Sequence, residues 1–138
     1  MKVIFADAAF WIARRDKRDD HHEIAARLVN RLLQERSHFL MTPLVFAEAH
    51  AHFSRSRPLR ERLIADCWRN PIVRLEQPTF EDQDQAIEIL AEHPDKTFSF
   101  CDAVSFAVME RLEISRVITF DDHFRQFGRF EVIDQDYL

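Results

Sequence analysis

The stretch that decides the fold is Lys2-Val3-Ile4-Phe5-Ala6, which is followed at once by Asp7. A short apolar run that ends abruptly in a polar residue is typical of a strand buried on both faces of a parallel sheet. Similar runs recur at residues 38–41, 72–75 and 117–120, and a weaker one at residues 130–133. The sequence therefore predicts a central sheet of about five short strands.

Segments with helical periodicity separate these strands. The clearest has Ile24, Leu28 and Leu32 spaced four residues apart, after Asp20 and Glu23, which have the spacing of a capping box. Further helices are predicted over residues 8–14, 42–54, 59–68, 79–91 and 99–112. Strands joined through helices pair in parallel. The predicted fold class is therefore α/β, with a short, mostly parallel central sheet flanked by helices, in a single domain over residues 1–138.

Composition excludes several other classes of protein. A single glycine argues against flexible linkers and against a turn-rich all-β fold. The first apolar run is too short for a signal peptide or a membrane span. Cys67 and Cys101 lie among apolar residues, which favours two buried thiols in a reduced cytoplasm over a disulfide. A net charge of −5 argues against a general nucleic-acid coat protein.

The basic residues are nevertheless unevenly spread. They gather in two short segments, Arg14, Arg15, Lys17 and Arg18, and then Arg55, Arg57, Arg60 and Arg62. For any one of these side chains, a position at a solvated helix end is a more common reason for the charge than a phosphate contact.

Two aspartates follow predicted strands. Asp7 comes directly after the first strand and Asp121 directly after the strand at residues 117–120. Ligands of open α/β sheets bind outside the carboxyl ends of the strands, so these two side chains are expected to converge. For either aspartate alone, the ordinary alternative is a loop or helix-cap residue.

Two further acids lie in apolar helices. Asp102 follows Ser99 with capping-box spacing, yet its neighbours are apolar on every face, so this helix start is expected to be buried. Glu48 is the only acid between Glu35 and Glu61. A buried carboxylate is costly unless it is paired or bound to a metal ion. The alternative for Glu48 is a solvated stripe shared with His52, one turn away.

Three or four carboxylates suit Mg²⁺ or Mn²⁺, which prefer hard oxygen ligands and keep several waters. One or two such ions can polarise a phosphodiester and lower the pKa of an attacking water, without a protein nucleophile. The pairs His21-His22 and His50-x-His52 lack the spacing of zinc ligands on one helix face. His123, two residues after Asp121, is expected to pack on the turn that follows the strand at residues 117–120.

Other chemistries fit less well. A cysteine nucleophile would need a thiolate near a base, whereas Cys101, between Phe100 and Asp102, is expected to be a small buried apolar residue. The one glycine, Gly128, is far from any strand–helix junction that could cradle phosphate. An aspartyl-phosphate enzyme would need a second acid two residues after Asp7, where this chain has Ala9.

Together these residues resemble the PIN-domain nucleases, and in particular the VapC-type toxins of toxin–antitoxin pairs. The resemblance runs from Val3 to Ile133 and is most specific over residues 99–130. There, residues 102–111 (DAVSFAVMER) look like the helix of the third acid, and residues 117–128 (VITFDDHFRQFG) like the strand and turn of the fourth.

The resemblance implies roles for individual residues. Asp7, Glu48, Asp102 and Asp121 would be the four catalytic, metal-binding acids, with Asp7 and Asp102 as direct ligands. Thr119 resembles the hydroxyl residue that supports the fourth acid, and Asp122, an acid the family pattern lacks, could share or take over the role of Asp121. Separately from the resemblance, Arg14, Arg15 and Arg125 are hypothesised to hold neighbouring RNA phosphates. The family implies a PIN fold, dependence on Mg²⁺ or Mn²⁺, endonucleolytic cleavage of RNA and, for many members, a homodimer inhibited by a partner antitoxin.

Two departures from the family pattern leave an alternative open. Ala8 and Ala9 stand where the family usually has a Thr or Ser just after the first acid, and Asp122 adds an acid beside the fourth. Missing outer partners weaken a metal site. The alternative is a PIN-fold nucleic-acid or protein-binding module that has lost catalysis.

Overall fold

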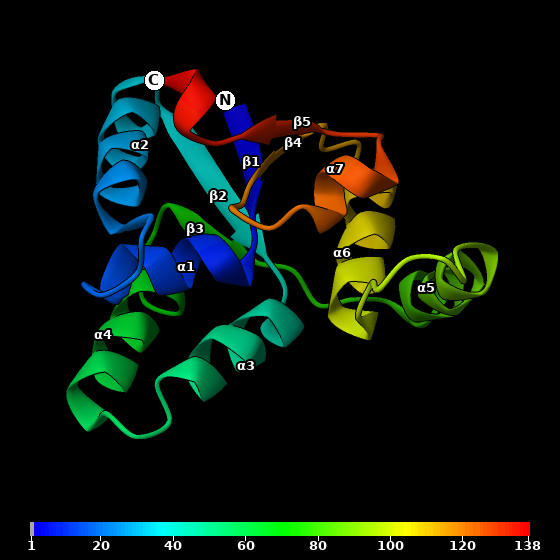
Figure 1. The fold of residues 1–138 in the computed structure, drawn as a ribbon, viewed down its shortest axis with the longest axis horizontal. Coiled ribbons are helices and arrows are strands. Elements are labelled where there is room, and N and C mark those ends of the chain that lie inside the picture. The colour runs from blue at the N-terminus through cyan, green and yellow to red at the C-terminus, as the bar shows by residue number, and fades with distance from the viewer. Residues whose placement is uncertain (1) are drawn as a thin grey trace.

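The computed structural model describes residues 2–138, whose strands form one sheet (Figure 1). The strands are β1 (Lys2–Ala6), β2 (Ser37–Met41), β3 (Val73–Leu75), β4 (Arg116–Ile118) and β5 (Glu131–Ile133). Their order is β3-β2-β1-β4-β5, and every neighbouring pair is parallel. The predicted α/β class, with a mostly parallel sheet of about five strands, is confirmed.

Helices connect these strands. They are α1 (Ala8–Arg15), α2 (His22–Gln34), α3 (Pro43–His52), α4 (Arg57–Cys67), α5 (Phe80–Glu92), α6 (Phe100–Arg111) and α7 (His123–Phe127), followed by a short 3₁₀ helix, η1 (Gln135–Tyr137). At the start of α3 the Thr42 hydroxyl accepts a hydrogen bond from the backbone N–H of Val45, and Pro43 occupies the first turn. None of the helices in residues 2–138 is long and apolar enough to cross a membrane.

The structure corrects three details. The predicted capping box at Asp20 is wrong, because α2 begins at His22 without a side-chain cap and the carboxylate of Asp19 instead accepts the backbone N–H of His21. The fourth strand ends at Ile118, so Asp121 does not follow it directly. The residues beyond it form the short helix α7, which the sequence analysis treated as a turn.

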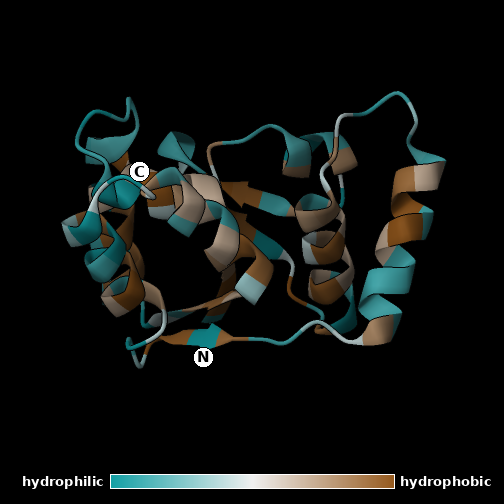
Figure 2. Ribbon diagram, turned by 90° about the horizontal axis from the view of Figure 1, so that it is seen from below, coloured by the Kyte–Doolittle hydropathy of each residue, from teal (hydrophilic) through white to brown (hydrophobic). Residues whose placement is uncertain are grey.

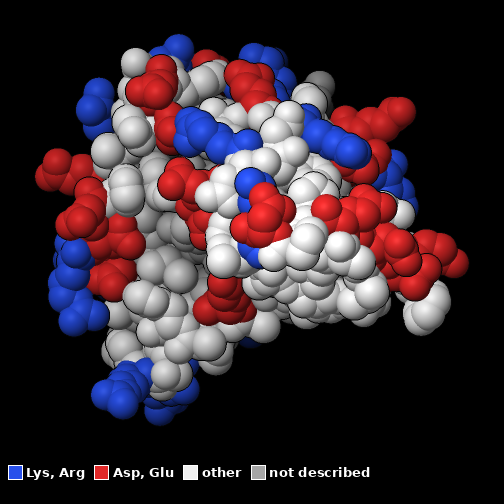
Figure 3. Space-filling model, turned by 45° about the vertical axis from the view of Figure 1, so that its right-hand side comes forward, with Lys and Arg blue, Asp and Glu red and all other residues white. Residues whose placement is uncertain are grey.

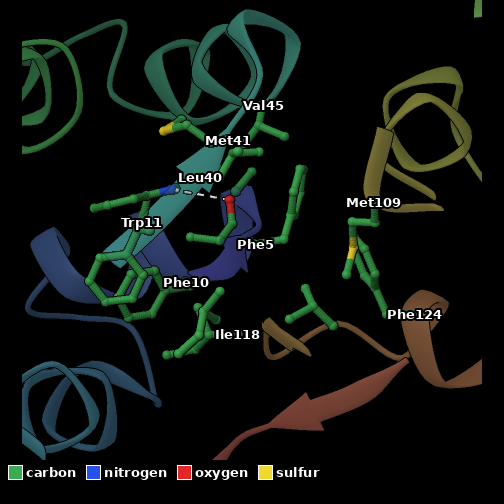
Figure 4. Packing of buried hydrophobic residues seen from close by; sticks show 14 of the residues in the cluster. Phe5, Phe10, Trp11, Leu40, Met41, Val45, Met109, Ile118 and Phe124 are labelled. Atoms are coloured by element: carbon green, nitrogen blue, oxygen red, sulfur yellow. Dashed lines mark hydrogen bonds between the residues drawn. The ribbon is translucent and has the colours of Figure 1, made fainter. Parts of the chain in front are cut away.

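Helices cover both faces of the sheet. Phe10 of α1 stacks on Phe39 of β2 with ring centroids 5.8 Å apart, and the Trp11 indole N–H donates to the carbonyl of Ala6 at 3.2 Å (Figure 4). On the opposite face, Phe5 packs against Phe124 of α7. Figure 2 shows the resulting distribution, with apolar residues on the strands and the inner sides of the helices.

Parallel pairing places the carboxyl ends of β1, β2 and β4 at one edge of the sheet. The start of α1, the start of α3 and Thr119 follow these three strand ends. α6 runs beside this part of the sheet, and α5 packs on the outer side of α6 (Figure 1). The fold therefore gathers residues from distant parts of the chain at this edge.

Candidate active site

Asp7 lies at the carboxyl end of β1 and is only 4% exposed. Its backbone N–H donates to the carbonyl of Ile118 in β4 at 3.2 Å, and the Thr119 hydroxyl donates to Asp7 Oδ2 at 3.0 Å. Burial raises the pKa of the Asp7 carboxyl to about 7, and the charges of Asp102 and Glu48 act in the same direction. Asp7 is therefore a buried acid whose ionisation needs help from a cation.

Asp102 is the third residue of α6 and is also buried. Its Oδ2 accepts the backbone N–H of Ser99 at 2.9 Å, and its own N–H donates to the Ser99 hydroxyl at 3.0 Å, which completes the predicted capping box. The same Oδ2 lies 2.7 Å from Nδ1 of His123. The cap and a functional role are thus compatible, because the carboxylate caps the helix and still faces the other acids.

Asp121 joins these two aspartates through Thr119 and His123. Its backbone N–H donates to the Thr119 hydroxyl at 3.1 Å, the same hydroxyl that donates to Asp7. Its Oδ1 accepts the backbone N–H of His123 at 2.8 Å and lies 3.2 Å from His123 Nδ1. Asp7, Asp102 and Asp121 therefore share one connected polar network.

Glu48 and Asp122 are placed differently. Glu48 is exposed on α3, and it lies near enough to raise the pKa of both Asp7 and the Cys101 thiol. Burial is the main cause of the raised pKa of Cys101, which keeps that thiol protonated and unsuited to nucleophilic attack. Asp122 is exposed at the start of α7 and, among residues 2–138, forms no hydrogen bond or ion pair with the other acids.

The donor set suits a hard divalent cation. No Lys or Arg within residues 2–138 forms an ion pair with Asp7 or Asp102, although both are buried carboxylates. In the same part of the chain no three His, Cys, Asp or Glu side chains are grouped closely enough to hold a metal ion. An ion held by these acids would therefore keep water among its ligands, which Mg²⁺ commonly does.

Two of the three arginines expected to hold phosphates are paired with aspartates. Arg15 makes a two-pronged ion pair with Asp66 of α4, and Arg125 Nη2 lies 2.6 Å from Asp134 Oδ2. Burial lowers the pKa of Arg14, whose side chain is largely enclosed. Their contact with RNA stays a prediction.

His123 contacts the acids more closely than the sequence indicates. Its ring packs against Phe98, as expected for a residue on the turn, but Nδ1 also contacts both Asp102 and Asp121. Its Nε2 lies 3.2 Å from the Thr97 hydroxyl. The available signal was its position two residues after Asp121, whereas its contact with Asp102 depends on the fold.

Ala8 and Ala9 provide no hydroxyl beside Asp7, but Thr119 does. This hydroxyl comes from β4's end, 112 residues away in sequence, and it orients Asp7 while also accepting from Asp121. The Thr119 hydroxyl, at the end of the neighbouring strand β4, therefore offsets the missing hydroxyl at Ala8 and Ala9.

Comparisons with known proteins identify the family of this chain. The family model described as "PIN domain" matches residues 4–129. The 23S rRNA-specific endonuclease VapC20 of Mycobacterium tuberculosis is 33% identical over 132 residues, which cover 94% of this chain and 98% of the relative. The crystal structure of that relative, described as a Sarcin-Ricin loop cleaving toxin, matches with a TM-score of 0.82 at 30% identity, over 94% of this chain and 98% of that one.

More distant structures share the fold. VapBC2 from Rickettsia felis, bound to a DNA fragment from its promoter, has a TM-score of 0.70 at 11% identity, covering 95% of this chain and 97% of that one. FitAcB from Neisseria gonorrhoeae has a TM-score of 0.65 at 14% identity, covering 98% of this chain and 99% of that one. With the family model matched over most of its length, the chain belongs to the PIN domain family.

Proposed function

We propose that this protein is a divalent-metal-dependent endoribonuclease that hydrolyses RNA phosphodiester bonds. The observation that carries the proposal is the pair of buried aspartates, Asp7 and Asp102, which have no Lys or Arg partner within residues 2–138. They belong to one polar network at the carboxyl edge of the sheet, where α/β proteins bind their ligands. Membership of the PIN domain family supports the same activity.

Each acid has a role in this proposal. Asp7 and Asp102 would hold Mg²⁺ or Mn²⁺ directly, and Glu48 and Asp121 would complete the site directly or through water. Such an ion supplies Lewis-acid polarisation of the phosphodiester and a lowered pKa for the attacking water. Thr119 fixes the orientation of Asp7 through its hydroxyl. Glu48 or Asp121, the more exposed acids, would accept the proton of that water.

The relative suggests a substrate class. Because VapC20 is named for 23S rRNA and its Sarcin-Ricin loop, we propose structured ribosomal RNA as the first substrate to test. We further propose that the protein acts in the cytoplasm as the toxin of a type II toxin–antitoxin pair. Its partners would then be a cognate antitoxin and a second copy of the chain.

Cleavage of 23S rRNA and of mixed single-stranded RNA tests the proposal. Each RNA is incubated with Mn²⁺, with EDTA and with the Asp7→Asn protein. We expect cutting only by the unaltered protein with Mn²⁺, since both the ion and its ligand are required. Cutting that persists in EDTA or in Asp7→Asn would reject the assignment. An unaltered protein that neither cuts RNA nor binds Mn²⁺ would favour the decayed binding module.

A further inference from the structure

The fold brings the two basic segments of the sequence together. One hollow, of about 390 Å³, is lined by Arg15, Asp16, Lys17, Arg18, Pro58, Leu59 and Arg62. The adjoining one, of about 420 Å³, is lined by Arg18, His52, Phe53, Ser54, Arg55, Ser56 and Leu59. They share Arg18 and Leu59, so the end of α1 and the turn between α3 and α4 form one continuous surface. We call it the basic hollow and define its cations as Lys17, Arg18, Arg55 and Arg62.

The charges of this surface face outward. The four cations are exposed, and within residues 2–138 Lys17, Arg55 and Arg62 form no ion pair. The one carboxylate that lines the hollow, Asp16, is buried and already accepts hydrogen bonds from the backbone N–H of Arg18 and from His52. Arg18 Nε lies 3.4 Å from Asp16 Oδ1, whereas Lys17, Arg55 and Arg62 have no acid paired with them in this part of the chain. The basic hollow therefore presents three cations that no neighbouring acid neutralises.

This concentration contrasts with the rest of the chain. Residues 14–18 and 55–62 hold eight of the 19 Lys and Arg residues but only two of the 24 Asp and Glu residues. In Figure 1 the turn between α3 and α4 is the lowest part of the molecule, and Figure 3 shows Lys and Arg side chains gathered at that end. An acidic protein repels a polyanion unless a local surface of this kind attracts it.

Two helices connect the basic hollow to the acids. α1 begins beside Asp7 and ends at Arg15, so its eight residues span about 12 Å. α3 carries Glu48 one turn before His52, which lines the hollow. An RNA whose scissile phosphate lies at the site of Asp7 and Asp102 would therefore reach the basic hollow with a few further nucleotides.

We propose that the basic hollow holds the backbone phosphates of the RNA on one side of the scissile bond. The proposal rests on the proposed function and deepens it, because it assigns the substrate's backbone to named residues. Arg14, Arg15 and Arg125, whose contact with RNA stays a prediction, would contribute less than the basic hollow, since those side chains are enclosed or paired with aspartates. A phosphate contact of this kind gives affinity without sequence preference.

The test compares two triple variants with the same change in net charge. The surface variant is Arg18→Gln, Arg55→Gln, Arg62→Gln. The control variant is Arg27→Gln, Arg36→Gln, Arg69→Gln, which alters three exposed arginines that line neither hollow and form no ion pair in residues 2–138. Binding of a fluorescent single-stranded RNA is measured in EDTA, so that no cleavage occurs, across a range of salt concentrations.

We expect the surface variant to bind RNA at least about 10-fold more weakly at low salt. The slope of log affinity against log salt should fall by about 2, since each lost single-strand phosphate contact removes about 0.7. The control variant should keep the slope of the unaltered protein. Equal losses in both variants, or no loss in either, would overturn the proposal.

A parallel titration with polyglutamate separates RNA from an acidic protein as the partner. If the surface variant lost affinity for polyglutamate and kept its affinity for RNA, the RNA assignment would be overturned in favour of an acidic protein. Because binding is measured without metal, these outcomes are independent of the proposed function. Failure of the proposed function would instead appear as absence of Mn²⁺-dependent RNA cleavage by the unaltered protein.

Discussion

Helices α5 and α6 begin with the same local structure but with very different surroundings. Thr79 and Asp82 form a capping box at the start of α5, and Ser99 and Asp102 form one at the start of α6. The two aspartates are 4% and 6% exposed. Local sequence and burial therefore do not distinguish them.

Their partners do. Arg111 donates to both carboxylate oxygens of Asp82, at 2.8 Å from Nε and 2.9 Å from Nη2. Burial alone would raise the pKa of Asp82, but the hydrogen bonds from Arg111 and Thr79 lower it below the usual value. Asp102 has His123 and the acids of the network instead. A buried aspartate with its own guanidinium stabilises the fold, whereas one without it is available to a ligand.

The largest expected effect separates the two aspartates in catalysis. Asp102→Asn keeps the capping oxygen but removes a proposed metal ligand, so RNA cleavage should fall about 1,000-fold or more, because such an ion contributes several kcal/mol to the transition state. Asp82→Asn should leave cleavage within about 3-fold, since Asp82 lies outside the network. Single-turnover cleavage with Mn²⁺ measures both. Equal losses of cleavage in the two variants would show that Asp102 has no role in catalysis that Asp82 lacks.

Stability as a function of pH should sharpen the comparison. The pKa of Asp7 is raised in the folded state to about 7, so the unfolded chain releases its proton first as pH rises above 3.8. The contribution of Asp7 to the free energy of unfolding of metal-free protein, taken as the difference from Asp7→Asn, should therefore fall by a few kcal/mol from pH 4 to pH 7 and then level off. Urea unfolding in EDTA measures this, and Asp7→Asn should lack that contribution. A stability that rises through this range equally in both proteins would contradict the account.

His123 should have an intermediate effect. It contacts Asp102 and Asp121 and packs on Phe98, which indicates a positioning role for these carboxylates. His123→Ala should weaken Mn²⁺ binding about 10-fold, as loss of an outer partner commonly does. His123→Asn, which keeps a nitrogen near the place of Nδ1, should recover part of that affinity. Tighter binding by His123→Ala would show that the imidazole occupies the place of the ion.

The smallest expected effect is the loss of stability on altering Asp82. Asp82→Asn removes the ion pair with Arg111, and because that guanidinium is about a third exposed we expect a loss of about 1 kcal/mol. Asp102→Asn should lose no stability in metal-free protein, because it removes a carboxylate that disfavours ionisation of Asp7. Thermal unfolding in EDTA compares the two. The reverse order of melting temperatures would contradict the proposed division of roles.

Much of the fold follows from local sequence. The five apolar runs give five strands, and the caps at Thr42, Thr79 and Ser99 are observed. The start of α2 was wrong because the carboxylate of Asp19 takes the backbone N–H of His21, so the chain turns before the helix begins. Such competition between neighbouring polar side chains cannot be resolved from spacing alone.

The candidate site was predictable only in part. The convergence of Asp7 and Asp121 follows from parallel strands, and their connection through Thr119 is observed. Arg111 lies 29 residues from Asp82, and Asp66 lies 51 residues from Arg15. Because these pairs join distant segments, the sequence could not show which acids and arginines neutralise each other. The basic hollow could not be predicted for the same reason, because it joins the end of α1 with the turn between α3 and α4.

The most direct test of the central claim is Mn²⁺ binding, measured by calorimetry on the unaltered protein, Asp102→Asn and Asp82→Asn at the same pH. We expect the unaltered protein and Asp82→Asn to bind Mn²⁺ with the same affinity, and Asp102→Asn to bind about 100-fold more weakly or not at all, because of these two aspartates only Asp102 belongs to the proposed metal site. Binding by Asp102→Asn as tight as that of the unaltered protein would contradict the account. Weakened binding by Asp82→Asn alone would place the ion at the start of α5 instead.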